Sequence, residues 1–250
     1  MVTIKSKHEI ELMKAAGRIT YEALKKMEEA VKPGITTREL DRIAEKYIKS
    51  CGASPSFKGY GGFPASICAS VNDEIIHGFP SDVPLKEGDI VSVDVGALYK
   101  GYNGDAARTF AVGKISENAQ RLIDVTKQSF FEGIKFAAEG NRISDISVAV
   151  QDFVEAKGYS VLRDYCGHGV GRDMHEDPEI PNYYTPGHRG IRIRPGMCLA
   201  IEPMVLEGEK DYYVADNDWT VVAADHKLTA HYENSVLITN NGPYLLTLCE

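Results

Sequence analysis

The sequence lacks the features that would attach a protein to a membrane or to nucleic acid. No apolar run reaches the ~18 residues that cross a bilayer, and the N-terminal residues MVTIKSKHEIELMKAAG lack the apolar core of a signal peptide. No dense cluster of Lys and Arg is present, and the net charge is −8, which is unsuited to a polyanionic partner. We therefore expect a cytoplasmic protein that binds neither membranes nor nucleic acid.

The sequence also lacks a regular cysteine pattern and several common catalytic motifs. The five cysteines are irregularly spaced, and no CxxC pair occurs, which suits reduced thiols better than a disulfide framework or a thiolate zinc site. A Walker loop, a GxSxG elbow and an HExxH helix are absent, and GHGVG at 167–171 lacks the third glycine of a dinucleotide loop. With 250 residues and 43% hydrophobic content, the chain is long enough for one large domain or two small ones, and we expect a single domain at 1–250.

The most informative stretch runs from residue 90 to residue 112 and predicts two strands. Valines at 91, 93 and 95 alternate with Asp94, which therefore points to the opposite face. A turn at Gly101 and Gly104 precedes a second strand that begins with Asp105. Either aspartate alone would be explained by a turn or by contact with water, but strands disfavour Asp. Two of them, each beside small residues, indicate a shared space that is open to a cation.

Periodicity predicts the other elements. Apolar residues at helical spacing predict four helices, and a Thr36–Glu39 capping box begins the second, which Gly52 ends. The helices are expected at 7–31, 36–51, 116–138 and 143–157. Strands are expected at 66–71, 197–205 and 231–239 in addition to the central pair. Residues 72–80, which include His77, form a polar segment, and residues 167–177 form a glycine-rich loop.

The second half of the chain repeats the first. At an offset of 108 residues KEGDIVSVD aligns with RPGMCLAIE, so that Asp94 falls on Glu202, and in the final hairpins Asp105 falls on Glu233. Acid thus meets acid twice. The repeat predicts a mixed α/β (α+β) fold in which two helix–helix–strand–strand halves, 1–113 and 114–250, are related by a pseudo-twofold axis. The halves share a curved antiparallel sheet with helices packed outside.

The repeat brings four carboxylates to the inner face of the sheet, where they cannot all be ionised and unpaired. No Arg or Lys shares their face, since Arg108 alternates to the opposite one. Two divalent ions about 3.5–4 Å apart are the better solution. His168 lies between glycines that let the backbone come close and is the expected nitrogen ligand, with His175 seven residues later. His231 alternates with Glu233 and is expected to support the site.

Six motifs together resemble the type I methionine aminopeptidases in their short bacterial form. They are HGFP at 77, VDVG at 93, GYNGDAARTF at 101, GHGVGRDMHEDP at 167, IEPM at 201 and HYEN at 231. The resemblance covers essentially the whole chain, and the order and spacing of the motifs agree throughout. It implies the pita-bread fold and a metal-dependent exopeptidase that removes the initiator methionine when the second residue is small.

The resemblance also implies roles for individual residues. Asp94, Asp105, His168, Glu202 and Glu233 would bind two divalent ions, with Asp105 and Glu233 bridging; Mn²⁺, Fe²⁺, Co²⁺ and Zn²⁺ all suit these donors. Glu202 would shuttle a proton, His175 would donate to the scissile carbonyl and His77 would contact the scissile amide. The methionine pocket would be lined by Tyr60, Phe63, Cys68, Met174 and Trp219.

Four positions depart from the pattern. Met174 stands where relatives often carry an aromatic residue, Phe57 where some carry Cys, Gly61 where some carry His, and Gly96 where some carry Thr. They affect the shape of the pocket and leave the ligands untouched.

Two alternative functions use the same fold. One is a proline-specific aminopeptidase with the same five ligands. The other is a non-catalytic binding protein, but such relatives lose metal ligands and none is lost here. The expected partners are the N-termini of nascent polypeptides, met near the ribosomal exit tunnel by a monomeric enzyme.

Overall fold

The computed structural model describes residues 2–248, and its four helices lie where the sequence predicts them. They are α1 (Lys7–Ala30), α2 (Thr37–Ser50), α3 (Glu117–Ile134) and α4 (Ile143–Ala156). The Thr36–Glu39 capping box is present: the Thr36 amide donates to Glu39 Oε2 at 2.8 Å, and the Glu39 amide donates to Thr36 Oγ1 at 3.2 Å. α3 ends four residues before the predicted end, because Lys135 already caps it.

The strands form four antiparallel sheets. β4 (Ile90–Tyr99) pairs with β5 (Tyr102–Ala111), and β4 also pairs with β1 (Ser54–Pro55) and β2 (Ile67–Val71). A five-stranded sheet runs in the order β15 (Gly242–Leu245), β14 (Asn234–Thr239), β9 (Cys198–Ile201), β7 (Cys166–Gly169) and β8 (Glu176–Pro181). Two smaller sheets have three strands each. One runs in the order β13 (Thr229–His231), β10 (Met204–Leu206) and β6 (Ser160–Val161). The other runs in the order β11 (Tyr212–Val214), β12 (Val221–Ala223) and β3 (Glu74–Ile76).

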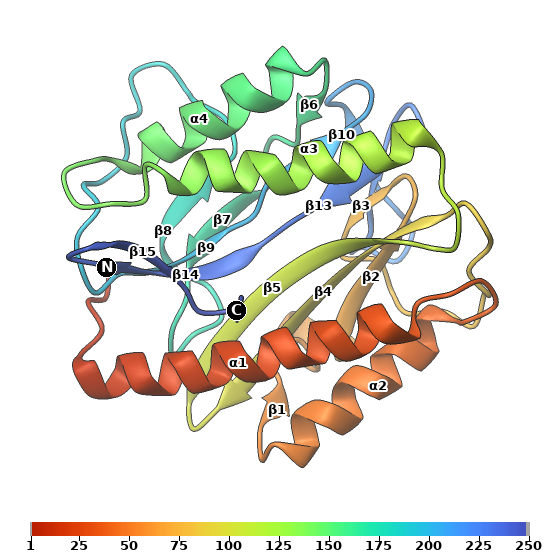
Figure 1. Cartoon of the computed structure of the whole chain (residues 1–250), viewed down its shortest axis with the longest axis horizontal. Helices are drawn as coiled ribbons and strands as arrows, with labels where there is room; N and C mark the ends of the chain where they lie inside the picture. Colours follow the sequence, from red (N-terminus) through yellow and green to blue (C-terminus); the bar gives the residue numbers. More distant parts are fainter. Residues whose placement is uncertain (1, 249–250) are drawn as a thin grey trace.

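The predicted duplication is visible in the fold. α1 and α2 cover the sheet of β4 and β5, and α3 and α4 lie over the strands of the second half, so that helices flank the strands on opposite sides (Figure 1). Equivalent glycines end equivalent turns, for Gly88 and Gly196 both have positive φ, at 96° and 87°. The α4 counterpart of Glu39 is Asp145, whose Oδ2 accepts from the Arg142 amide at 2.8 Å.

The two halves meet where β5 lies beside the strands of the second half. The Ser235 hydroxyl bridges them, since it accepts from the Asp105 amide at 3.0 Å and donates to the Asp105 carbonyl at 2.9 Å. The Glu233 amide donates to the Ala107 carbonyl at 3.0 Å. These bonds tie two of the predicted acidic positions to the same seam.

Two strands that the sequence predicts to be continuous are interrupted in the structure. The predicted strand 197–205 divides at Glu202 and Pro203 into β9 and β10, and 231–239 divides at Tyr232 and Glu233 into β13 and β14. Proline cannot donate to a strand ladder, so the pairing breaks beside Glu202. Both glutamates therefore project from strand interruptions, whereas both aspartates lie within strands.

Two local predictions need correction. The glycine-rich segment 167–177 is a loop only at 170–175, because its two ends belong to the strands β7 and β8. The polar segment 72–80 holds the short strand β3, which the sequence did not indicate. Gly104 lies inside β5 and not in a turn. A Cβ at Gly104 would approach the Gly17 amide nitrogen to 2.7 Å, so this glycine allows α1 to pack closely on the sheet.

The alternation of the central strands is confirmed. Val91, Val93 and Val95 are fully buried in the apolar cluster beneath α1 and α2, so Asp94 faces the interior of the seam. A second cluster joins α3 and α4 to β9 and β14. Among residues 2–248, no helix is both long and apolar enough to cross a membrane.

Candidate metal centre and active site

The four predicted carboxylates converge on one cavity. Asp94 comes from β4, Asp105 from β5, Glu202 from the break after β9 and Glu233 from the break before β14, and all four line the same pocket. Asp105 and Glu233 are only 3% and 1% exposed. One carboxylate oxygen each of Asp94, Asp105 and Glu233 is buried without a hydrogen-bond partner among the described residues. Buried polar atoms are rarely left unpaired, and the three residues that carry these oxygens line one cavity.

His168 completes this cluster with a nitrogen that is prepared to bind a cation. Its Nε2 lies 3.6 Å from both Asp105 Oδ2 and Glu202 Oε1. Its Nδ1 lies 2.8 Å from the Gly169 carbonyl, which can only accept, so Nδ1 carries the proton and Nε2 presents its lone pair. Burial lowers the pKa of His168 to about 4, which keeps the ring neutral, as a metal ligand must be.

The acids resist ionisation when no cation is near them. Burial raises the pKa of Asp94 to about 7. Burial, reinforced by the neighbouring carboxylates, holds the pKa of Asp105, Glu202 and Glu233 well above the usual range. Ligand atoms of Asp105, His168 and Glu233 all lie within 4.8 Å of one another. Hard oxygen donors with one imidazole fit a divalent cation, which would pair the orphaned oxygens.

His231 lies behind this cluster. It is 2% exposed, and its Nε2 lies 3.7 Å from Glu202 Oε2. His231 is not among the residues that line the cavity. Its backbone amide donates to the Thr109 hydroxyl at 2.9 Å, which fixes its position. Its contact with Glu202 fits the supporting position that the alternation with Glu233 predicts.

The cavity has a volume of about 180 Å³ in all, and its lining beyond the carboxylates is largely apolar. All five predicted pocket residues line it: Tyr60, Phe63, Cys68, Met174 and Trp219. The Phe63 ring packs edge-on against Trp219, with centroids 5.2 Å apart. Sequence reasoning missed Ile76, Tyr165 and Cys166, which also line the pocket. Tyr165 and Cys166 directly precede the glycine-rich motif, and Ile76 adjoins His77, so their proximity to site residues was the only available indication.

Three of the four positions that depart from the family pattern, Phe57, Gly96 and Met174, lie near one another. A Cβ on Gly96 would lie 2.8 Å from Ser56 Cβ and 3.1 Å from Phe57 Cε1, so a side chain at 96 would collide with Ser56 and press against Phe57. Gly61 lies against Trp219, because a Cβ there would be 3.3 Å from the ring. Met174 joins Phe57 in the same buried cluster. The bulk of Phe57 is thus accommodated by the absence of a side chain at 96.

His77 and His175 both line the cavity. His175 Nδ1 lies 2.7 Å from the Tyr60 hydroxyl, and its ring centroid is 4.2 Å from that of His168. Partial burial lowers the pKa of His175. His77 has a positive φ of 60° and packs edge-on against Tyr165 at 5.9 Å. Strained backbone of this kind is typical of functional positions.

Comparisons with known proteins agree with this geometry. Residues 11–240 match the model of metallopeptidase family M24. The chain is 59% identical to a methionine aminopeptidase of Clostridium acetobutylicum, with 100% of both chains covered. It is 50% identical to methionine aminopeptidase 1 of Bacillus subtilis, with 99% of both covered.

Solved structures show the same relationship. A methionine aminopeptidase from Thermotoga maritima superposes with a TM-score of 0.96 at 46% identity, over 99% of each chain. A prolidase from Pyrococcus furiosus superposes with a TM-score of 0.81 at 27% identity, but only 66% of that chain is covered. The predicted pita-bread fold is confirmed by these neighbours. The chain therefore belongs to metallopeptidase family M24 and, within that family, to the methionine aminopeptidases.

Proposed function

We propose that this chain is a metal-dependent aminopeptidase that removes the N-terminal methionine from polypeptides whose second residue is small. One observation carries the proposal: a single cavity joins four carboxylates and His168 to an apolar pocket lined by sulfur and aromatic rings. The end of the cavity that holds the carboxylates and His168 suits metal-dependent hydrolysis, and the apolar end suits a thioether side chain.

We assign Asp94, Asp105, His168, Glu202 and Glu233 as ligands of two divalent ions, drawn from Mn²⁺, Fe²⁺, Co²⁺ and Zn²⁺. Asp105 and Glu233 are assigned as the bridging ligands. The orphaned oxygens of Asp94, Asp105 and Glu233, together with the neutral Nε2 of His168, support this set of ligands. Ions bound there would lower the pKa of a water molecule and polarise the scissile carbonyl.

Other residues would handle protons and orient the substrate. Glu202 is 13% exposed at its side chain, so it borders the cavity and can accept a proton and pass it to the leaving amine. The lowered pKa of His175 keeps its ring neutral at pH 7. A Tyr60 hydroxyl that donates to Nδ1 places the single ring proton of His175 on Nε2, where it can stabilise negative charge on the carbonyl oxygen. His77 would hydrogen-bond the scissile amide.

The pocket favours methionine over charged side chains. Tyr60, Phe63, Cys68, Met174 and Trp219 would contact the substrate, and a thioether gains about 0.3–1.5 kcal/mol from contact with an aromatic ring. The aromatic, apolar lining offers Lys, Arg, Asp or Glu no counter-charge, and burying a charge alone is costly. Branched Val and Ile would collide near Cβ in a narrow pocket.

We further propose that residues 1–250 act as a single catalytic domain and as a monomer in the cytoplasm, on nascent chains close to the ribosome. The apolar clusters of both halves and the hydrogen-bonded seam at Ser235 support one unit. The family relationship supports nascent chains as the substrates.

The alternatives are less well supported. A proline-specific enzyme is not favoured, because identity to the prolidase is 27%, against 59% to a methionine aminopeptidase. A non-catalytic binding protein is not favoured either, because all five predicted ligand positions line the cavity.

The direct test is mass spectrometry of the products of Met-Ala-Ser. The metal-loaded protein should release free methionine and Ala-Ser. A chelator should abolish release, and Mn²⁺ or Co²⁺ should restore it. Full activity in a metal-free sample would refute the metal centre, and no release under any metal would refute the enzyme assignment.

A further inference from the structure

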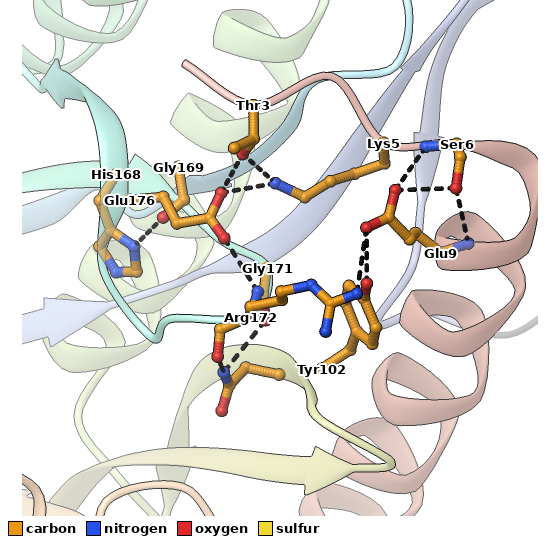
Figure 2. A network of polar contacts seen from close by, with 11 residues as sticks. Thr3, Lys5, Ser6, Glu9, Tyr102, His168, Gly169, Gly171, Arg172 and Glu176 are labelled. Atoms are coloured by element: carbon orange, nitrogen blue, oxygen red, sulfur yellow. Dashed lines mark hydrogen bonds and ion pairs between the residues drawn. The ribbon is translucent and has the colours of Figure 1, made fainter. Parts of the chain in front are cut away.

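The loop that ends in His175 rests on a buried ion pair that the chemistry described above does not use. Lys5 Nζ lies 2.5 Å from Glu176 Oε2, with the side chains only 4% and 10% exposed. The Thr3 hydroxyl contacts the same carboxylate oxygen. Figure 2 shows Glu176 between the N-terminal segment on one side and the Gly171–Arg172 backbone on the other. The pair therefore joins two segments that are 171 positions apart.

The second oxygen of Glu176 holds the loop itself. Oε1 accepts from the Arg172 amide at 2.9 Å. Gly171 packs directly against the pair: a Cβ there would lie 2.3 Å from Glu176 Oε1 and 2.6 Å from Lys5 Nζ. The backbone of the loop thus lies close against the ion pair, with no space for a side chain at 171, and we expect a shift of the pair to move the loop.

A second set of contacts holds the opposite side of the loop. Asn103 Nδ2 donates to the Gly171 and Arg172 carbonyls at 3.1 and 3.0 Å. The Arg172 guanidinium lies 4.7 Å over the ring of Tyr102, whose hydroxyl donates to Glu9 Oε1 at 2.6 Å (Figure 2). The loop belongs to the second half of the chain, but it is held by β5 and by the start of α1 from the first half.

We infer that Lys5 and Glu176 are positioning residues for His175. Glu176 directly follows His175 in the chain, so the ion pair fixes the backbone from one side while the Tyr60 hydroxyl holds the ring from the other. The inference rests on the proposed function, in which His175 donates to the scissile carbonyl. A displacement of about 1 Å in such a group can cost about 10²-fold in rate.

Removing one partner should disturb the loop more than removing both. Lys5→Met keeps the length of the side chain but leaves the Glu176 carboxylate buried without its cation, which is strongly unfavourable. Lys5→Met combined with Glu176→Gln leaves no buried charge, and the glutamine oxygen can still accept from the Arg172 amide. We expect the double variant to recover part of the activity that Lys5→Met loses.

The test is a cycle of Lys5→Met and His175→Ala, in which kcat and KM for Met-Ala-Ser and metal content are measured. Lys5→Met should lower kcat about tenfold, with KM changed less than about twofold and metal content unchanged. In the His175→Ala background it should lower kcat no further. Lys25→Met is the matched control, because Lys25 pairs with Glu28 at the surface with 45% and 48% exposure, and it should leave kcat unchanged.

The outcomes separate this inference from the proposed function. Equal loss of kcat from Lys5→Met in both backgrounds, or loss of metal, would overturn the positioning role. An unchanged kcat in His175→Ala would instead overturn the role of His175 itself. If Lys5→Met does not fold, Glu176→Gln carries the same cycle, and Lys5→Arg, which keeps the charge, should retain most of the activity.

Discussion

His168, in β7, and His175, directly before β8, differ in what surrounds their ring nitrogens. His168 Nε2 faces Asp105 and Glu202, whereas His175 contacts the Tyr60 hydroxyl. We expect His168→Ala to lose metal and activity together. His175→Ala should keep its metal and lose about 10²–10³-fold in kcat, the scale for one oxyanion donor. Metal analysis of both variants beside their kcat values provides the check, and equal metal loss in both would remove His175 from the role of donor.

Single residues also show what the sequence could and could not predict about the site. Asp94 and Asp105 were predictable because strand alternation fixes the face of each residue, and Glu202 and Glu233 followed from the repeat. Lining residues such as Ile76 and Tyr165 were not, because nothing distinguishes them from ordinary core residues in the sequence. The Lys5–Glu176 pair was equally hidden, since a contact over 171 positions leaves no local pattern.

Among the elements, α1 packs unusually closely on β5. The Thr20 hydroxyl donates to the Gly104 carbonyl at 3.1 Å, and a Cβ on Gly104 would meet backbone atoms of Ala16 and Gly17 at 2.7–2.8 Å. Backbone atoms cannot rotate away, so Gly104→Ala should lower the free energy of unfolding by about 1–3 kcal/mol.

Chemical denaturation of Gly104→Ala, beside Glu29→Ala on the solvent-exposed face of α1, measures this cost. The Glu29 variant should unfold like the parent protein. A Gly104 variant as stable as the parent would show that α1 can move away from β5 without cost.

Whole elements were predicted well where periodicity is long and poorly where strands are short. The four helices and the strands of 90–112 follow from regular spacing over ten residues or more. β7, β8 and β3 were missed because they contain six residues or fewer. Glycine-rich β7 resembles a loop, yet a Cβ on Gly167 would lie 2.3 Å from the Ala200 carbonyl, so glycine is required there by strand packing.

For the whole molecule, the buried acids predict how stability depends on pH. Raised carboxyl pKa values mean that the folded metal-free protein keeps protons that the unfolded chain has released. Stability then falls as pH rises. The lowered pKa values of His77, His168 and His231 act in the opposite direction, but only below the usual histidine pKa of about 6.5.

From pH 7.5 to 8.5 the histidines are nearly all neutral in both the folded and the unfolded state, so the acids set the slope. We expect the Tm of the metal-free protein to fall across this range and the Tm of the metal-loaded protein to change much less. Differential scanning fluorimetry with and without Mn²⁺ measures both curves. A metal-free Tm that rises with pH over this window would contradict the clustered, protonated acids.

The most direct test of the central claim is a comparison of kcat/KM for four peptides with the metal-loaded enzyme. The joined metal centre and thioether pocket predict rapid cleavage of Met-Ala-Ser. They predict slow cleavage of Leu-Ala-Ser, and slow cleavage of Met-Lys-Ser because its second residue is large. Ala-Pro-Ser should not be cleaved, because alanine cannot fill the pocket. A higher kcat/KM for Leu-Ala-Ser or Ala-Pro-Ser than for Met-Ala-Ser would contradict the account.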